Sequence, residues 1–213
     1  RDWSSDVCSS DLLEPLSPPF GFDTASNLFS GTTTDSINFG KLPENYTLFH
    51  VARYAGPNRQ RIFGSSNEGT SNNWLSGFWG GMNGMVHHNQ WITQSTASQS
   101  TPLDWVVTTD QHTTQTQNIA RINGIDRSIN PNGSAPTGTW GINLPNLAWA
   151  EQSDFAVAEV IVYNKKLSTA EMTAVENYLT AKYVNPAAPL VGYLAGGGWA
   201  PDQMCPSGSV ATG

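Results

Sequence analysis

The most hydrophobic stretch of the chain, DFAVAEVIVY at residues 154–163, restricts the fold more than any other feature. Its β-branched and aromatic residues favour an extended strand. Side chains alternate along a strand, so the even-numbered residues 156–162 share one face and the odd-numbered residues 155–163 share the other. Both faces are largely apolar. Such a strand must be covered on both sides, which predicts a place in the middle of a layered structure.

Several other segments also read as strands. YTLFHVARY, residues 46–54, is rich in β-formers and largely apolar on both faces. QRIFG at 60–64 and DWVVTT at 104–109 are shorter candidates. NIARINGIDR, residues 118–127, holds Asn-Gly between β-type residues, which is the strongest short-range signal for a hairpin.

Residues 73–93, NWLSGFWGGMNGMVHHNQWIT, predict a second hairpin. Two alternating runs flank a glycine-rich centre, so we expect a loop of about five residues, 80–84, between them. Trp74, Ser76 and Phe78 should share one face of the first strand, and Trp79 should lie on the other. His87 and His88 are neighbours and therefore point to opposite faces, so they cannot easily share a metal ion.

A helix is predicted at about 168–183, within the segment LSTAEMTAVENYLTAKY that starts at Leu167. Ser168 and Glu171 form a capping box, and Leu167 and Met172 occupy the positions of a hydrophobic staple. Apolar residues then recur at helical spacing, which gives one stripe that can dock on a sheet. Regularly spaced strands with turn signals and one helix predict an all-β fold, a two-sheet antiparallel sandwich. Residues 128–146 read as a Pro/Gly/Asn-rich loop.

Residues 1–12 do not read as part of a fold. They carry no strand or helix period, but DWSSDVCSSDL translates a common sequencing adapter without a gap. We therefore expect an adapter artefact at 1–12, a sandwich domain at 13–184 and, at 185–213, a linker with the truncated start of a further segment. The sequence is then expected to be a metagenomic fragment whose sandwich lacks its first strand.

The composition excludes some function classes. Charged residues make up 13% of the chain and the net charge is −7, without a Lys/Arg cluster. This argues against a nucleic-acid partner. No apolar run reaches membrane-spanning length, so membrane insertion is not expected. A surface of hydroxyls and amides is typical of extracellular β-proteins. No cofactor is expected, although a calcium ion held by backbone carbonyls and one Asp at a loop stays open.

The order of segments resembles a known family. AEVIVYN followed by LSTAEMTAVENYLTAKY is similar to the closing part of laminin-G-like jelly-roll domains of the concanavalin A-like lectin/glucanase superfamily. YTLFHVARY, RIF, NWLSGFWGG and RINGIDR add to the resemblance, which covers roughly residues 28–184. It implies a jelly-roll sandwich from a larger extracellular, cell-surface or virion-surface protein. It says little about activity, since this superfamily holds lectins, adhesion modules and hydrolases.

The carboxylates argue against catalysis. The superfamily's hydrolases typically carry Glu-x-Asp-x-x-Glu, and this pattern is absent; the nearest acids are Glu151, Asp154 and Glu159. Asp154 and Glu159 are separated by an odd number of positions, so a regular strand places them on opposite faces. Glu159 is expected to be a buried structural acid paired with an arginine such as Arg53 or Arg121, or with backbone amides. We expect no enzyme activity.

A binding surface remains as the predicted functional site. Glycan sites combine a stacking aromatic ring with hydrogen-bonding side chains, and the second hairpin is rich in both. The candidate ligand-binding residues are Trp74, Trp79, Asn83, His88, Asn89 and Trp91, with Trp140 from the long loop. The expected partner is a glycan or glycoprotein, beside neighbouring domains of the parent chain. Two alternatives stay open: an accessory domain of a multidomain glycoside hydrolase, and a structural spacer without a ligand.

Overall fold

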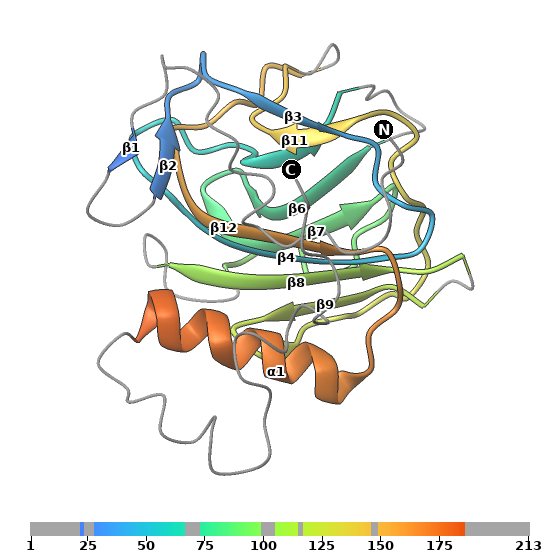
Figure 1. Ribbon diagram of the computed structural model, residues 1–213. Coiled ribbons are helices and arrows are strands. Elements are labelled where there is room, and N and C mark those ends of the chain that lie inside the picture. The colour runs from blue at the N-terminus through green and yellow to red at the C-terminus, as the bar shows by residue number, and fades with distance from the viewer. Residues whose placement is uncertain are drawn as a thin grey trace, which may run out of the picture.

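Two antiparallel β-sheets stacked on one another form the body of the protein (Figure 1). The computed structural model describes residues 22–23, 28–66, 73–98, 105–114, 117–145 and 149–185. The predicted adapter segment and nearly all of the predicted linker, 186–213, lie outside these ranges, so the proposed domain limits stay predictions. No helix in the described ranges is long and apolar enough to cross a membrane.

The larger sheet has seven strands in the order β1-β2-β12-β4-β8-β9-β10. Their bounds are Phe22–Asp23 (β1), Leu28–Gly31 (β2), Phe155–Tyr163 (β12), Tyr46–Tyr54 (β4), Val106–His112 (β8), Ile119–Ile122 (β9) and Ile125–Asp126 (β10). The smaller sheet has five strands in the order β3-β11-β5-β6-β7. Their bounds are Ile37–Gly40 (β3), Trp140–Ile142 (β11), Phe63–Ser65 (β5), Trp74–Trp79 (β6) and Met82–His88 (β7).

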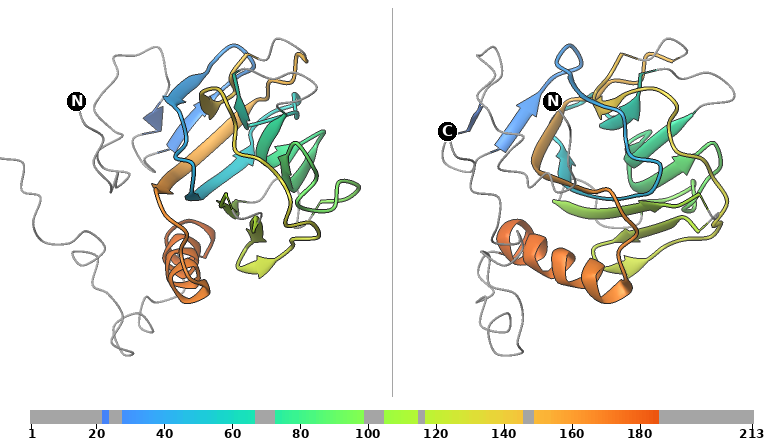
Figure 2. Two further views of the ribbon diagram at one scale, coloured as in Figure 1. Left: turned by 90° about the vertical axis from the view of Figure 1, so that its right-hand side faces the viewer. Right: turned by 45° about the vertical axis from the view of Figure 1, so that its right-hand side comes forward.

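Strands β4 and β12 pair at the centre of the larger sheet, which confirms the prediction from their apolar faces. Leu48, Ala52 and Tyr54 of β4 pack in the core between the sheets. Phe49 and Val51 point the other way, into a second core beneath helix α1 (Thr169–Leu179). Both Figure 1 and Figure 2 show α1 lying against the outer side of the larger sheet, below β8 and β9. The larger sheet is thus the middle layer of three, and both faces of β4 are apolar because both are covered.

A β-bulge overturns the predicted faces of β12. Val157 pairs with Ala52, but Glu159 pairs with Val51, so one extra residue is inserted between them. After the bulge the alternation is reversed: Phe155 and Val157 share the inter-sheet core with Val160 and Val162. Ile161 and Tyr163 pack on the helix side with Ala158. Simple alternation was wrong here because it assumes that no residue is inserted.

One of the two hairpins follows the prediction, and the other differs from it in its turn. Asn123 and Gly124 both have positive φ and connect β9 to β10, as the Asn-Gly signal predicts. The turn between β6 and β7 is shorter than the five residues expected. Trp79 pairs with Met82, so only Gly80 and Gly81 form the turn, both with positive φ. Of the other three residues placed in the loop, Met82 and Asn83 pair with β6, and Gly84 is the extra residue at the register shift opposite Gly77 and Phe78.

Some strands were not predicted from the sequence. Strand β11 lies inside residues 128–146, which were expected to be loop, and β1, β2 and β3 precede the first predicted strand. These strands have two to four residues each, too short to show a clear alternation. Gly141 of β11 lies very close to the backbone of β3. A Cβ atom at this position would lie 1.9 Å from the backbone oxygen of Ile37, so only glycine fits there.

Helix α1 begins as predicted. The side chain of Ser168 accepts a hydrogen bond from the backbone N–H of Glu171, and the Glu171 carboxylate accepts one from the backbone N–H of Ser168. These bonds hold the pKa of Glu171 below its usual range. The helix ends at Leu179 and continues as a short π-helical turn, Thr180–Val184. The predicted span of 168–183 is thus confirmed.

Loss of the capping box should weaken this helix measurably. We expect Ser168→Ala to lower the free energy of unfolding by about 1 kcal/mol. The backbone N–H of Glu171 loses its acceptor, and the reciprocal bond from the backbone N–H of Ser168 to the Glu171 carboxylate loses its support. Denaturation by urea at neutral pH measures this change. Thr169→Ala, at the exposed next position, is the matched control and should change the stability by less than about 0.5 kcal/mol. Equal effects of the two substitutions would contradict the capping role.

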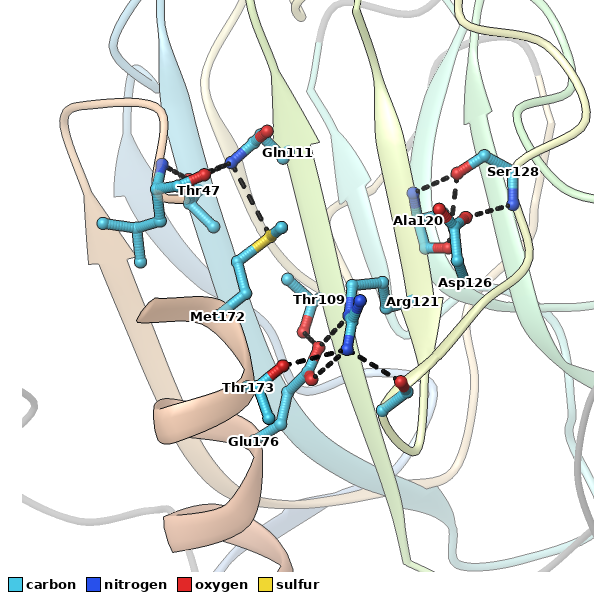
Figure 3. A network of polar contacts seen from close by, with 12 residues as sticks. Thr47, Thr109, Gln111, Ala120, Arg121, Asp126, Ser128, Met172, Thr173 and Glu176 are labelled. Atoms are coloured by element: carbon cyan, nitrogen blue, oxygen red, sulfur yellow. Dashed lines mark hydrogen bonds and ion pairs between the residues drawn. The ribbon is translucent and has the colours of Figure 1, made fainter. Parts of the chain in front are cut away.

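Polar contacts fix the helix to the larger sheet (Figure 3). Gln111 of β8 donates to the hydroxyl of Thr47 and to the carbonyl of Leu167 over 2.9 and 3.0 Å, which positions the start of the helix. Further along, Arg121 of β9 forms an ion pair with Glu176 of the helix, 2.8 Å from Nε to Oε1. The helix is therefore docked by buried polar groups as well as by its apolar stripe.

Glu159 has an ionic partner that the prediction did not name. Its carboxylate lies 2.9 Å from Nζ of Lys182 in the π-helical turn. Arg121 is committed to Glu176, and the guanidinium of Arg53 lies over the ring of Trp105 instead. The prediction that Glu159 is a structural acid is consistent with this pair. Its partner comes from the end of the helix, which the sequence alone could not place beside β12.

Candidate functional site

Four of the seven predicted ligand-binding residues lie in the interior. Trp74, Asn83, His88 and Trp140 are each at most 3% exposed. Trp74 donates from Nε1 to the hydroxyl of Tyr46 over 3.0 Å and stacks on the ring of His88. Trp140 was expected in a loop but belongs to β11. These four residues cannot reach a ligand, so their assignment to the site is corrected.

The interior histidine has a structural role. Nε2 of His88 lies 2.9 Å from a carboxylate oxygen of Asp110 on β8, and both side chains are fully buried. This contact joins the two sheets through the core. His50 of β4 makes a similar connection, with Nε2 3.1 Å from the hydroxyl of Ser76 on β6. The tryptophan and histidine side chains that alternation turns toward the opposite sheet are therefore structural residues of the core.

Asn89 supports the hairpin. It has positive φ, its side-chain oxygen accepts from the backbone N–H of Asn73 over 2.5 Å, and its amide group donates to Ser134. Both ends of the amide are thus already engaged. Asn89 shapes the turn beside the remaining candidates, and its contacts are those of a structural residue.

Trp79 and Trp91 remain as partly exposed aromatic residues. Their ring centroids lie 5.3 Å apart with an interplanar angle of 56°. His87 joins them: its ring lies edge-on to Trp91 at 4.8 Å. His88 points into the core, so its neighbour His87 faces away from the larger sheet. We call Trp79, His87 and Trp91 the aromatic platform, on the outer face of the five-stranded sheet.

Polar residues border the platform. Glu151 accepts a hydrogen bond from Nε1 of Trp79 over 3.2 Å and forms an ion pair with Arg61, 2.5 Å from Oε2 to Nε. Arg61 also donates to the side chain of Asn73 over 2.9 Å, and its guanidinium lies over the ring of Trp149 at 5.3 Å. The platform residues are thus held by their neighbours before any ligand arrives.

The protonation state of His87 follows from its surroundings. Burial, the main cause, lowers the pKa of its imidazole; the hydrogen bond to the backbone of Asn73 opposes this, and the electrostatic effects of Arg61 and His88 add to the lowering. His87 is therefore neutral at neutral pH. Its Nδ1 lies 2.9 Å from the carbonyl oxygen of Asn73, which can only accept, so Nδ1 carries the proton. Nε2 is left as a hydrogen-bond acceptor.

Sequence reasoning missed several residues of this site. Arg61, Asn73 and Trp149 were not candidates, and Glu151 was considered only as a catalytic acid. Arg61 and Glu151 are separated by 90 positions, so no local pattern indicates their contact. Trp149 follows the long loop, where no period connects it to the hairpin.

Metal-binding chemistry is not indicated by the side chains in the described part of the chain. Within the ranges that the structure covers, no group of three or more His, Cys, Asp or Glu residues is placed to hold an ion. The histidine pair of β7 is split between the two faces of the strand, as alternation predicts.

The comparisons with protein-family models and with curated proteins gave no match. Solved structures, in contrast, share the fold. Domain 4 of AbnA, a GH43 extracellular arabinanase from Geobacillus stearothermophilus, was solved in complex with arabinotriose. It matches with a TM-score of 0.54 at 12% identity, over 74% of this chain and 80% of that domain.

Two larger proteins contain similar regions. The receptor binding domain of botulinum neurotoxin D matches with a TM-score of 0.51 at 13% identity, over 76% of this chain and 46% of that one. Trypanosoma rangeli sialidase matches with a TM-score of 0.48 at 13% identity; the match covers 73% of this chain and only 28% of the sialidase. At such low identities the likeness concerns the fold, and by that criterion the chain is a two-sheet β-sandwich protein.

Proposed function

We propose that this protein is a non-catalytic carbohydrate-binding or adhesion module whose ligand binds at the aromatic platform. The observation that carries the proposal is the pair of partly exposed indoles, Trp79 and Trp91, at 5.3 Å beside the hydrogen-bonding group of His87. Sugars present apolar C–H faces and many hydroxyls, so they suit an indole ring with a polar neighbour. The fold shared with a domain solved with arabinotriose supports the same ligand class.

The arrangement of the acids supports a role in binding without catalysis. Glycoside hydrolysis typically needs two carboxylates that flank the scissile bond. Glu151 is engaged by Arg61 and Trp79, and Glu159 pairs with Lys182 on the helix side of the larger sheet. Asp154 accepts from the backbone and side-chain N–H groups of Asn58 over 2.9 and 3.0 Å, so it holds the β4–β5 loop.

We further propose that the module belongs to a larger extracellular, cell-surface or virion-surface protein, of the laminin-G-like type that the sequence resembles. The low content of charged residues, 13%, supports this. A role as accessory domain of a hydrolase is the second candidate, because domain 4 of AbnA is one domain of an arabinanase. The sequence of the complete parent gene separates the two, since only the second requires a catalytic domain in the same chain.

Removal of either indole should abolish most of the binding. We expect Trp91→Ala and Trp79→Ala each to weaken glycan binding at least about tenfold, roughly 1.4 kcal/mol, because the stacking surface is lost. A glycan array selects the ligand, isothermal titration calorimetry gives the Kd, and thermal unfolding confirms that each variant is folded.

Trp105→Ala provides the matched control. Trp105 is also a partly exposed tryptophan, but it packs with Arg53 on the helix side of the larger sheet. Its loss should leave the Kd unchanged. Unchanged binding in both platform variants would refute the site, and the absence of binding to any glycan would favour a structural spacer.

A further inference from the structure

We infer that the platform selects an uncharged, soluble glycan, and that Nε2 of His87 accepts a hydrogen bond from one of its hydroxyls. The inference rests on the proposed function and specifies its ligand class. Three independent features of the platform support it: the angle between the indoles, the balance of charge around them and the direction of the hydrogen bond at His87.

The angle between the indoles excludes a flat ligand. The planes of Trp79 and Trp91 are inclined by 56°, and their centroids are only 5.3 Å apart. A flat polysaccharide surface, such as that of a crystalline fibre, can stack on coplanar rings but cannot contact both faces of an inclined pair. A single sugar unit, or a chain that turns between neighbouring units, can follow such a corner.

The guanidinium that borders the platform is already paired. Arg61 binds Glu151 and Asn73, and its side chain is only 7% exposed. Arg59 lies near the β6–β7 turn, where its carbonyl accepts from Gly81, but its Nε donates to Gly56 and so turns the side chain toward the β4–β5 loop. The chain as a whole carries a net charge of −7, of which −2 comes from residues 1–12, so the remainder is also acidic. A carboxylated or sulfated sugar would be repelled by the net negative charge of the chain, and it would find Arg61 already paired with Glu151 and Nε of Arg59 already bonded to the carbonyl of Gly56.

The hydrogen bond at His87 has a fixed direction. Because Nδ1 donates to the carbonyl of Asn73, the neutral ring offers a lone pair at Nε2. A ligand must therefore bring an O–H donor to this nitrogen while its apolar face lies near the ring of Trp91. A sugar hydroxyl meets this demand, whereas an ionised carboxylate or sulfate group only accepts and cannot occupy this position.

The test compares three ligand sets on the same protein. Calorimetry at pH 7 measures soluble neutral oligosaccharides (arabinotriose, xylotriose and cellotriose) and charged ones (trigalacturonate and sialyllactose), and a pull-down measures microcrystalline cellulose. We expect at least one neutral oligosaccharide to bind at least tenfold more tightly than either charged one, with no retention on cellulose. Charged or crystalline ligands that bind equally well, and lose binding in Trp91→Ala, would overturn this inference while leaving the proposed function intact.

Two variants test the acceptor. His87→Phe keeps an aromatic ring beside Trp91 but removes Nε2, and we expect binding of the neutral ligand to weaken at least tenfold in a variant that thermal unfolding shows to be folded. His87→Gln keeps a hydrogen-bonding group and should retain more of the affinity than His87→Phe. Wild-type affinity in both variants would refute the role of His87, even if Trp91 is required. The failure of every glycan to bind would overturn the proposed function and this inference together.

Discussion

Replacement of Glu176 by alanine is expected to lower the free energy of unfolding by about 3–5 kcal/mol. Glu176 is 2% exposed. Its carboxylate accepts from Nε and Nη2 of Arg121 over 2.8 and 2.9 Å and from the hydroxyl of Thr109 over 2.6 Å. Its loss leaves a guanidinium, whose pKa this carboxylate raises, without its anionic partner under the helix.

Urea denaturation at pH 7 measures this loss, and two controls isolate its cause. The double variant Arg121→Met with Glu176→Leu removes both charges and should be much less destabilised than Glu176→Ala alone, because no buried charge is then left unpaired. Lys165→Ala breaks the exposed pair with Glu171, whose side chains are 59% and 48% exposed, and should cost less than about 1 kcal/mol. A loss below about 1 kcal/mol for Glu176→Ala would show that the pair does not hold the helix.

Mild acid is expected to destabilise the protein through His50. Burial between the sheets is the main cause that lowers the pKa of His50 from 6.5 to about 3, against the opposing charge of Asp110. The unfolded chain binds this proton near pH 6.5 and the folded chain does not. Stability from this group is therefore complete above pH 6.5 and is lost as the pH falls toward 3.

The expected loss from His50 between pH 6.5 and 5.0 is about 2 kcal/mol, since each pH unit contributes up to about 1.4 kcal/mol for one proton. His87 and His112 act in the same direction, because burial also lowers the pKa of each. Urea denaturation at several pH values measures the slope of the unfolding free energy against pH. In His50→Gln this slope should be smaller by the equivalent of nearly one bound proton. This expectation does not depend on the stability of the variant at pH 8.

Ser76→Ala is the matched control for this experiment. It removes the hydroxyl that lies 3.1 Å from Nε2 of His50 but leaves the imidazole buried between Phe63 and Gly77. Its pH slope should remain at least as steep as that of the wild type, even though its stability is lower at every pH. An unchanged slope in His50→Gln would mean that other groups cause the sensitivity to acid.

Much of the fold could be predicted because its signals are local. The capping box of Ser168 and Glu171 lies within four residues and defines the start of the helix wherever the helix docks. Asn123-Gly124 likewise determines its own turn. The two segments that are apolar on both faces form β12 and β4, which pair over most of their length. Both lie inside the sheet because each has two apolar faces that must be covered.

The candidate site could be predicted only in part. The hairpin of β6 and β7 was the right region, and Trp79 and Trp91 were among its candidates, but sequence alone could not separate them from Trp74 and His88. All four are aromatic residues on alternating segments. The bulges and the position of the second sheet decide which face of the hairpin is buried. Neither can be predicted from the residues of the hairpin alone.

By itself, the sequence determined the strands with strong alternation, the capped helix, the Asn-Gly turn and therefore a β-sandwich, because each rests on neighbouring residues and on the burial of apolar side chains. Only the tertiary structure decided the reversal of faces at the β12 bulge and the pairing of Glu159 with Lys182. It also decided the contacts of Arg61, Glu151 and Trp149 beside the two partly exposed indoles. These contacts join positions far apart along the chain, and their geometry follows from how the sheets pack.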